Sequence, residues 1–165
     1  MLTIRERIDD NAVAQATLVL PFHLRQKSRL LARLTSGEEV GLMLERGTVL
    51  RGGDRLRADD TRVVAVVAAD EALMEARCDD ATGLARCAFH LGNRHTPVEV
   101  RAGALRFAAD DVLAAMLRGL GAHVDAIAAP FEPEAGAYAG GHHHSGEAKH
   151  GGIIHDMVER TSRQR

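Results

Sequence analysis

Several kinds of residue are scarce in this chain of 165 residues. It has no tryptophan, and aromatic residues make up only 3% of it, so the hydrophobic core must consist mainly of leucine, valine, isoleucine and alanine. Two cysteines, Cys78 and Cys87, are too few for a disulfide scaffold and indicate reduced thiols. No stretch approaches the roughly 18 consecutive apolar residues that a membrane-spanning helix needs. The composition therefore predicts an ordinary globular protein, small enough to gain stability from burial in a dimer.

The chain also lacks an excess of charge of one sign. Its formal net charge is −2 with histidine counted as neutral, and its basic residues are interspersed with acidic ones. We therefore expect neither nucleic acid nor a membrane surface as a partner. The first ten residues, MLTIRERIDD, have no apolar run typical of a signal peptide. These features predict a cytoplasmic protein.

Residues 1–67 are predicted to form a small all-β domain. Short apolar runs alternate with turn-forming residues at intervals of about ten residues, which is typical of a small sandwich or barrel-like module. The runs expected to be strands are 14–20, 40–45, 48–50 and 63–68. A basic segment, 25–34, has two interpretations: a solvated strand or loop, or a surface that docks a partner protein.

Residues 68–132 change to a mixed pattern of strands and helices. A strand over 72–78 precedes a helix, whose apolar side is formed at helical spacing by Leu84, Cys87, Ala88 and Leu91. Asp79 or Asp80 can cap the start of this helix, and Gly92-Asn93 can end it with a left-handed residue.

The same region continues with a hairpin over 98–107, a second helix and a strand over 123–129. The second helix follows Asp110 and places on one side Val112, Leu113, Met116, Leu117 and Leu120. The resulting order βαββαβ predicts a ferredoxin-like domain, so the fold class of the whole chain is α+β.

Residues 133–165 are expected to form a flexible, histidine-rich tail. This segment is rich in glycine and has little to bury, so folding would not offset its loss of chain entropy. The tail contains a run of three histidines and a fourth nearby, and such composition binds divalent transition metals. The candidate ligands are His142, His143, His144 and His150. A purification tag and an inert linker are the two other interpretations of these histidines.

His95 is a further candidate metal ligand, in the segment HLGNRHTP directly after the first predicted helix. One imidazole alone does not hold a divalent cation tightly. A two-fold axis beside His95 would bring the same residue from two chains together, and the tails would then add ligands. An ordinary surface histidine is the other interpretation of His95. Structural roles are expected for His23 and His123, a structural or surface role for His90 and an inert core position for Cys87. Cys78 is either structural or an exposed soft ligand.

One segment in particular, CAFHLGNRHTPVEV (87–100), resembles the hallmark of the UreE family of urease accessory nickel chaperones. The histidine-rich tail also fits this family. Further similar segments are VGLMLERGTVLRGGDRL (40–56), LRFAADDVLAAMLRGLGAHV (105–124) and PFEPEAGAY (130–138). The resemblance covers most of the chain in the expected order.

This resemblance implies a homodimer that is not an enzyme, with a β-rich N-terminal domain that docks partners and a ferredoxin-like domain that binds metal and dimerises. His95 would supply the metal site at the dimer interface, and His142, His143, His144 and His150 would add ligands. The cargo would be Ni(II), with Zn(II) or Cu(II) as competitors. The partners would be the accessory GTPase UreG and the complex of the urease apoprotein with its accessory proteins.

Two other functions have to be distinguished from this one. A general divalent-metal buffer or storage protein not linked to urease would have the same physical features and differ only in its partners. A metal-dependent hydrolase would need three fixed ligands, an open coordination position and a general base. The sequence has no HExxH motif and no clustered carboxylate–histidine pair, so a hydrolase is disfavoured.

Overall fold

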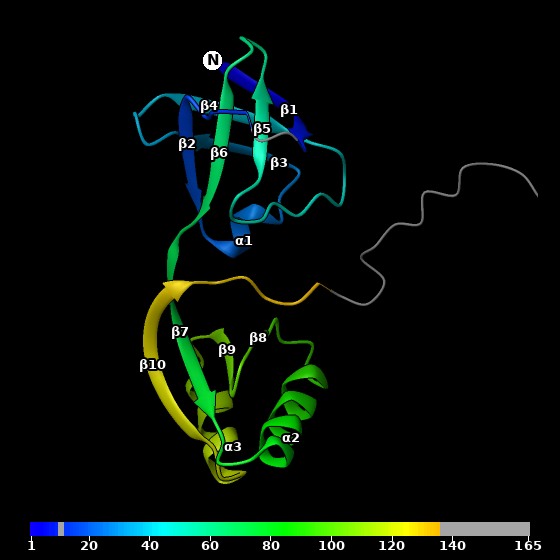
Figure 1. Ribbon diagram of the computed structural model, residues 1–165, viewed down its shortest axis with the longest axis vertical. Coiled ribbons are helices and arrows are strands. Elements are labelled where there is room, and N and C mark those ends of the chain that lie inside the picture. Colours follow the sequence, from blue (N-terminus) through cyan, green and yellow to red (C-terminus); the bar gives the residue numbers. More distant parts are fainter. Residues whose placement is uncertain (10–11, 136–165) are drawn as a thin grey trace, which may run out of the picture. The chain divides into compact units, whose positions relative to one another are not determined.

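The computed structural model of the chain describes residues 1–9 and 12–135. Two β-sheets follow one another along the sequence (Figure 1). The elements of the first part are β1 (Leu2–Ile8), β2 (Ala16–Leu20), α1 (Phe22–Arg25), β3 (Arg29–Arg33), β4 (Glu39–Met43), β5 (Arg55–Ala58) and β6 (Val63–Ala68). Those of the second part are β7 (Asp70–Arg77), α2 (Ala81–Gly92), β8 (Glu99–Arg101), β9 (Ala104–Ala108), α3 (Asp111–Gly119) and β10 (His123–Pro130).

The first sheet has six strands in the order β2-β6-β5-β1-β4-β3. The pairs β1–β4 and β2–β6 are parallel, and the other neighbouring strands are antiparallel. Its two edge strands approach each other, because the N–H of Thr35, just after β3, donates to the carbonyl of Thr17 in β2 at 2.9 Å. The sheet therefore curls as expected for a barrel-like module.

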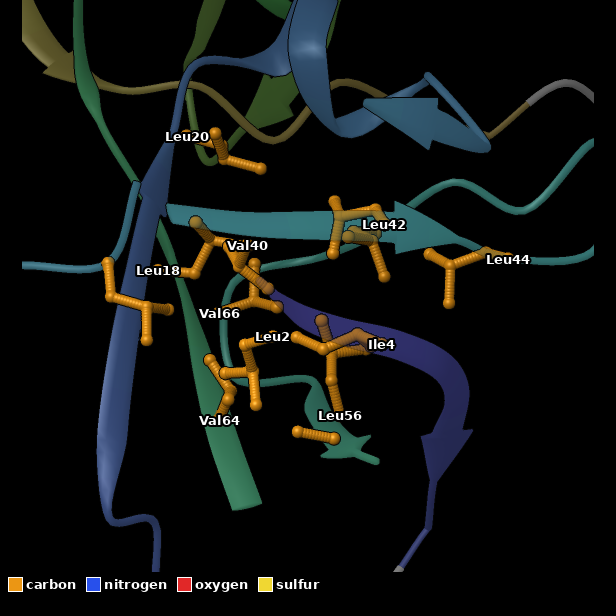
Figure 2. Close-up of a cluster of buried hydrophobic side chains, with 13 residues drawn as sticks. Leu2, Ile4, Leu18, Leu20, Val40, Leu42, Leu44, Leu56, Val64 and Val66 are labelled. Atoms are coloured by element: carbon orange, nitrogen blue, oxygen red, sulfur yellow. The ribbon is translucent and has the colours of Figure 1, made fainter. Parts of the chain in front are cut away.

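Aliphatic side chains fill the interior of this sheet (Figure 2). The buried cluster consists of Leu2, Ile4, Leu18, Leu20, Leu34, Val40, Leu42, Leu44, Leu50, Leu56, Ala58, Val64 and Val66. Strands from both ends of the sheet contribute to it, so the cluster stabilises the curled form. The prediction of a core built from leucine, isoleucine, valine and alanine is confirmed here.

The strands predicted over 14–20, 40–45 and 63–68 are present as β2, β4 and β6. The strand predicted over 48–50 is wrong, since Leu50 lies in a connecting segment whose N–H donates to the carbonyl of Arg25. Sequence reasoning missed α1, β1 and β5. The last two carry several arginines, and β1 also has a register shift between Ile4 and Glu6 that breaks its alternation. In the basic segment, β3 is a solvated strand, whereas Arg25 is fully buried.

The second sheet has the order β10-β7-β9-β8, with all neighbours antiparallel. Together with the element order βαββαβ, this topology is ferredoxin-like and confirms the predicted α+β fold. The Asp110 carboxylate begins α3 by accepting from the N–H groups of Val112 and Leu113 at 2.8 and 2.9 Å. Gly121, with φ of +92°, follows the end of α3, where a left-handed residue stops the helix.

Both helices pack on one face of the second sheet (Figure 1). The buried cluster between them and the sheet consists of Met74, Ala76, Cys87, Leu91, Leu105, Phe107, Ala114, Leu117, Ala122 and Val124. Val112, which was expected on the apolar side of α3, is 79% exposed instead. The helix places Ala114 in the core, because a small side chain lets α3 lie close to the sheet.

Charged side chains of both signs occupy the opposite face of this sheet and form ion pairs. Arg106 Nε in β9 lies 2.7 Å from Glu75 Oε2 in β7. Arg77 contacts Glu75 at 2.6 Å and Asp125 of β10 at 2.6 Å. Arg106 is directly opposite Glu75 on the neighbouring strand, whereas Arg77 pairs with Glu75 along its own strand and diagonally with Asp125.

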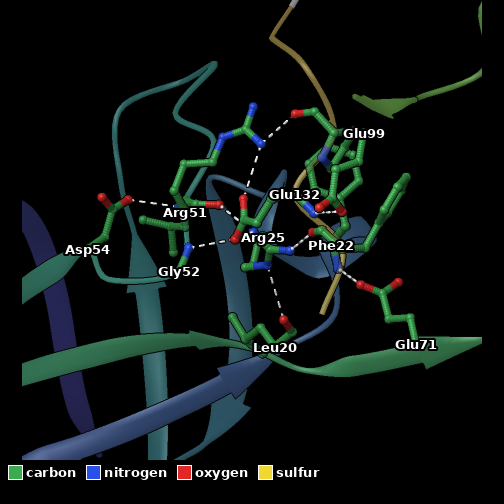
Figure 3. Close-up of polar contacts among 12 residues, drawn as sticks. Leu20, Phe22, Arg25, Arg51, Gly52, Asp54, Glu71, Glu99 and Glu132 are labelled. Atoms are coloured by element: carbon green, nitrogen blue, oxygen red, sulfur yellow. Dashed lines mark hydrogen bonds and ion pairs between the residues drawn. The ribbon is translucent and has the colours of Figure 1, made fainter. Parts of the chain in front are cut away.

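The guanidinium of Arg25 connects the first part of the chain to the segment that follows β10 (Figure 3). Although Arg25 is fully buried, its nitrogens donate to the carbonyls of Leu20 and Leu50 and to that of Phe131. It also forms an ion pair with Glu132 at 2.7 Å. A buried guanidinium is tolerated only when its donors are satisfied, so these acceptors hold the chain segments in place.

Glu132 is the centre of this network (Figure 3). Besides Arg25, its carboxylate accepts from the N–H of Gly52 at 2.7 Å and contacts Arg51 at 3.2 Å. Its own N–H donates to Glu99 Oε2 of β8 at 3.0 Å. Burial alone raises the pKa of Glu132, but the hydrogen bonds from Gly52, Arg25 and Arg51 outweigh that effect and lower the pKa below 4.5.

The chain leaves the second sheet beside β8. The N–H of Glu134 donates to the carbonyl of Val98 at 2.8 Å, and the carbonyl of Pro133 accepts from Arg51 at 2.7 Å. These two residues belong to the segment 133–165 that was expected to be a tail. Residues 136–165, with all of the tail histidines, lie outside the described residues.

The lowered pKa of Glu132 predicts a specific dependence of stability on pH. The stabilisation it provides is fully present above the unfolded-state pKa of about 4.5, and it is lost as the pH falls through the lower folded-state value. We expect Glu132→Gln to have a smaller free energy of unfolding than the wild type at pH 7. The difference should shrink steadily below pH 4.5 in urea titrations. The exposed Glu45→Gln serves as control, and an equal loss at pH 7 and pH 3 for Glu132→Gln would contradict the assignment.

Candidate functional site

The site is built around the end of α2. The helix begins at Asp80, whose carboxylate accepts from the N–H of Gly83 at 2.7 Å. Its predicted apolar side is confirmed, with Cys87 and Leu91 buried and Leu84 and Ala88 partly buried against the same core. This packing fixes the position of the helix end and of the loop that follows.

The helix end differs from the prediction in one respect. Asn93 is right-handed, with φ of −63°, so the Gly92-Asn93 pair does not supply the left-handed residue. His95 does so instead, with φ of +54°, and its N–H donates to the carbonyl of Gly92 at 2.9 Å. The N–H groups of Arg94 and Thr96 both donate to the carbonyl of Leu91. The loop is therefore tightly hydrogen-bonded around an exposed His95.

A histidine in this conformation has an energetic cost. A left-handed backbone brings Cβ close to the following carbonyl, which costs roughly 1–2 kcal/mol for a residue other than glycine. Among non-glycine residues of the described chain, only His95 and Thr61 have a positive φ. Backbone strain of this kind is often found where a side chain has to be presented in one direction. The imidazole is thus held outward on a rigid loop.

Phe89 and His90 lie one to two turns before His95. Phe89 is 62% exposed, and its ring meets that of the half-buried His90 edge-on at 5.4 Å between centroids. The carbonyl of His90 accepts from Arg94 Nη1 at 3.0 Å, which further ties the loop to the helix. Sequence reasoning missed Phe89, although its position off the apolar side of α2 in a chain with four phenylalanines was a usable signal.

The structure does not bring His95 together with other candidate ligands in one chain. Within residues 1–9 and 12–135, no group of three or more histidine, cysteine or acidic side chains is arranged to hold a metal ion. His142, His143, His144 and His150 lie outside the described residues. His23 and His123, expected in structural roles within apolar surroundings, are both exposed, because each sits at the end of its apolar run rather than inside it.

The two cysteines lie next to each other. Cys87 is fully buried, as expected for a core thiol, and burial together with the hydrogen bond to Cys78 raises the pKa of Cys87 to about 11. Cys78 is half-buried, with its Sγ 3.7 Å from that of Cys87. Cys78 therefore faces another thiol rather than a set of nitrogen or oxygen ligands.

The strained conformation of His95 predicts an unusual order of stabilities. His95→Gly should exceed His95→Ala in its free energy of unfolding by about 1 kcal/mol, because glycine has no Cβ to clash. At the exposed helical position Ala85, substitution by glycine should instead lower the free energy by about 1 kcal/mol. Urea unfolding of the three variants measures both effects. Equal stability of His95→Gly and His95→Ala would show that residue 95 is not left-handed in solution.

No helix within the described part of the chain is long and apolar enough to cross a membrane. Known families match both parts of the sequence. Residues 3–69 match the N-terminal domain of the UreE urease accessory protein, and residues 71–158 match its C-terminal domain.

Individual relatives cover most of the chain. The urease accessory protein UreE of Nitrosospira multiformis is 54% identical over 171 residues, covering 98% of this chain and 97% of the relative. The UreE proteins of Burkholderia pseudomallei and Burkholderia thailandensis are 55% and 56% identical, each over 90% of this chain and 76% and 73% of the relative. These relatives are urease accessory proteins and not enzymes. The matches confirm the resemblance found in the sequence. The chain belongs to the UreE family of urease accessory proteins.

Proposed function

We propose that this protein is a cytoplasmic nickel carrier that works as a homodimer and delivers Ni(II) to the urease maturation machinery. The observation that carries the proposal is the presentation of His95, exposed and rigidly held at the end of α2. Neutral imidazole is a borderline ligand well suited to Ni(II). The position of this histidine, in a family of urease accessory proteins, is what a carrier of the urease metal requires.

One chain supplies too few ligands for tight binding. His95 has no metal-binding cluster around it in the described part of the chain, so a second source of ligands is needed. In a two-fold dimer each residue near the axis meets its own copy. Two His95 imidazoles would then face each other and share one ion.

Phe89 supports a dimer contact close to His95. Phe89 is a large aromatic side chain on a helix, and it is 62% exposed. Such exposure is unusual in a chain in which aromatic residues make up only 3%. Removing such a ring from water stabilises an interface, and aromatic residues are enriched at interface centres. The same part of α2 would thus contribute the apolar contact and position the ligand.

The tail histidines His142, His143, His144 and His150 would complete the coordination. The described chain ends just after Glu134, whose backbone is hydrogen-bonded to Val98, three residues from His95. From there to His142 an extended chain spans at most roughly 30 Å. Tethered ligands have a high effective concentration, so the tail raises affinity without a preformed site.

Release of the cargo follows from the same ligands. Imidazole titrates near neutral pH, so mild acidification or competition by a partner's ligands weakens the site. The acceptor we propose is the accessory GTPase UreG, acting with the complex of the urease apoprotein and its other accessory proteins. Residues 1–67 would dock these partners, and the exposed Arg29, Leu31 and Arg33 on edge strand β3 are a suitable surface. Zn(II) and Cu(II) would compete, because imidazole ligands favour them as well.

Nickel titration by calorimetry tests the central site. The wild type should show one tight binding event with a stoichiometry of about one ion per dimer, and His95→Ala should abolish it. Deleting residues 136–165 should lower the total stoichiometry and weaken binding by roughly 10- to 100-fold while leaving the dimer intact. His123→Ala, at another exposed histidine, is the matched control. A tight event that survives His95→Ala would refute the site, and a complex with UreG that nickel does not strengthen would favour a general metal buffer.

The dimer contact has its own test. Phe89→Asp places a charge where we propose apolar burial, so it should shift the protein to monomer at concentrations where the wild type is dimeric. Leu31→Asp changes a side chain of similar exposure, 63% against 62%, in strand β3 of the first sheet and should leave the dimer unchanged. Sedimentation equilibrium distinguishes the two states. If Phe89→Asp dimerises with the same affinity as the wild type, the interface lies elsewhere.

A further inference from the structure

The two thiols are placed for a reaction with each other. Cys78 directly follows β7 and Cys87 lies in the middle of α2, with their sulfurs 3.7 Å apart. Cys87 is fully buried, whereas Cys78 is half-buried and lines a cavity of about 190 Å³. The cavity is also lined by Asp79, Asp80, Thr82, Gly83 and Arg86. Only one of the two sulfurs is therefore accessible from this cavity.

Gly83 makes room for this arrangement. It lies one helical turn before Cys87, on the same side of α2. A Cβ at position 83 would lie 3.3 Å from Cys78 Cβ and 3.6 Å from its Sγ. A side chain at position 83 would therefore be tight against Cys78 Cβ, which would have to move by a few tenths of an ångström. Its absence lets the Cys78 sulfur rest against the helix beside Cys87.

We propose that Cys78 and Cys87 are a site of reversible oxidation, in which a small disulfide of the glutathione type enters the cavity and leaves the two cysteines joined. A disulfide bond is about 2.05 Å long, so the two sulfurs have to approach by less than about 2 Å. Neither cysteine belongs to the proposed nickel site, so the inference does not depend on it.

The reaction proceeds in two exchanges. The Cys78 thiolate, having lost its proton to solvent, attacks one sulfur of oxidised glutathione, forms a mixed disulfide and releases one glutathione thiolate, which takes up a proton. The Cys87 sulfur then attacks the Cys78 sulfur, and the second glutathione leaves with the Cys87 proton. In sum, two protein thiols lose two electrons and two protons, and one glutathione disulfide becomes two thiols.

The order of attack follows from access and acidity. Cys87 is buried and its pKa is raised to about 11, so it remains a thiol and does not react with molecules in solution. Once Cys78 carries a glutathione, an adjacent sulfur at high effective concentration completes the exchange. The resulting disulfide bond links the segment after β7 to α2, the helix that precedes the loop with His95.

Intact-mass spectrometry after incubation of the folded protein with oxidised glutathione tests the proposal. The wild type should lose the mass of two hydrogen atoms and retain no glutathione, and peptide mapping should join Cys78 to Cys87. Cys87→Ala should instead accumulate one glutathione on Cys78. Cys78→Ala should react at least about tenfold more slowly than the wild type.

Circular dichroism of each variant checks that it is folded, and Cys87→Val replaces Cys87→Ala if the smaller side chain destabilises the core. Three results would overturn the inference. They are a wild type that stays unmodified, a wild type that keeps its glutathione, and a Cys78→Ala variant that reacts as fast as the wild type.

Discussion

The buried guanidinium of Arg25 is the interaction on which the arrangement of this chain depends. It lies in α1, within the first part of the chain, yet two of its acceptors, the Glu132 carboxylate and the Phe131 carbonyl, come from the segment after β10. An arginine without water must have nearly all of its donors satisfied, which leaves few positions for those acceptors. Phe131 packs edge-on against Phe22 at 5.6 Å, so apolar contact and ion pairing act on the same segment. The segment that precedes the histidine-rich residues is thereby fixed at its start.

The second constraint concerns the number of ligands. In the described part of the chain, His95 is the only histidine with a positive φ, and no group of three or more possible metal ligands is present there. In the proposed nickel site, His95 would define where the ion binds and the histidines after residue 140 would set how tightly. Such a site would exchange its cargo more readily than a closed four-ligand site, in which every ligand is fixed by the fold. The proposed site would therefore suit transport rather than structural or catalytic use of the metal.

Much of the fold followed from periodicity. The apolar side of α2 and its acidic cap were predicted because apolar spacing and capping chemistry are local properties of the sequence. The ferredoxin-like order was predicted because helix and strand signals alternate clearly after residue 68. By contrast, β5 was missed because it has only four residues, and β1 because a register shift between Ile4 and Glu6 breaks its alternation. The burial of Arg25 was missed because two of its acceptors, in Phe131 and Glu132, lie more than a hundred residues away in the sequence.

The site was predicted less completely. His95 was identified from its neighbours in sequence, but the left-handed residue was expected in the pair Gly92-Asn93, whose residues have the better intrinsic preference. Here the hydrogen bonds of the loop to Leu91 and Gly92 decide which residue takes that conformation. The contact between Cys78 and Cys87 was likewise invisible, because it depends on how β7 joins α2 and on the missing side chain of Gly83.

The position of the Arg25 acceptors has a consequence for biosynthesis. All six strands of the first sheet lie before residue 69, so this sheet can assemble on the ribosome while the rest of the chain is still being made. At that stage Arg25 has the carbonyls of Leu20 and Leu50 but no carboxylate. The nascent protein therefore carries an incompletely neutralised cation in its first domain until translation has passed Glu132.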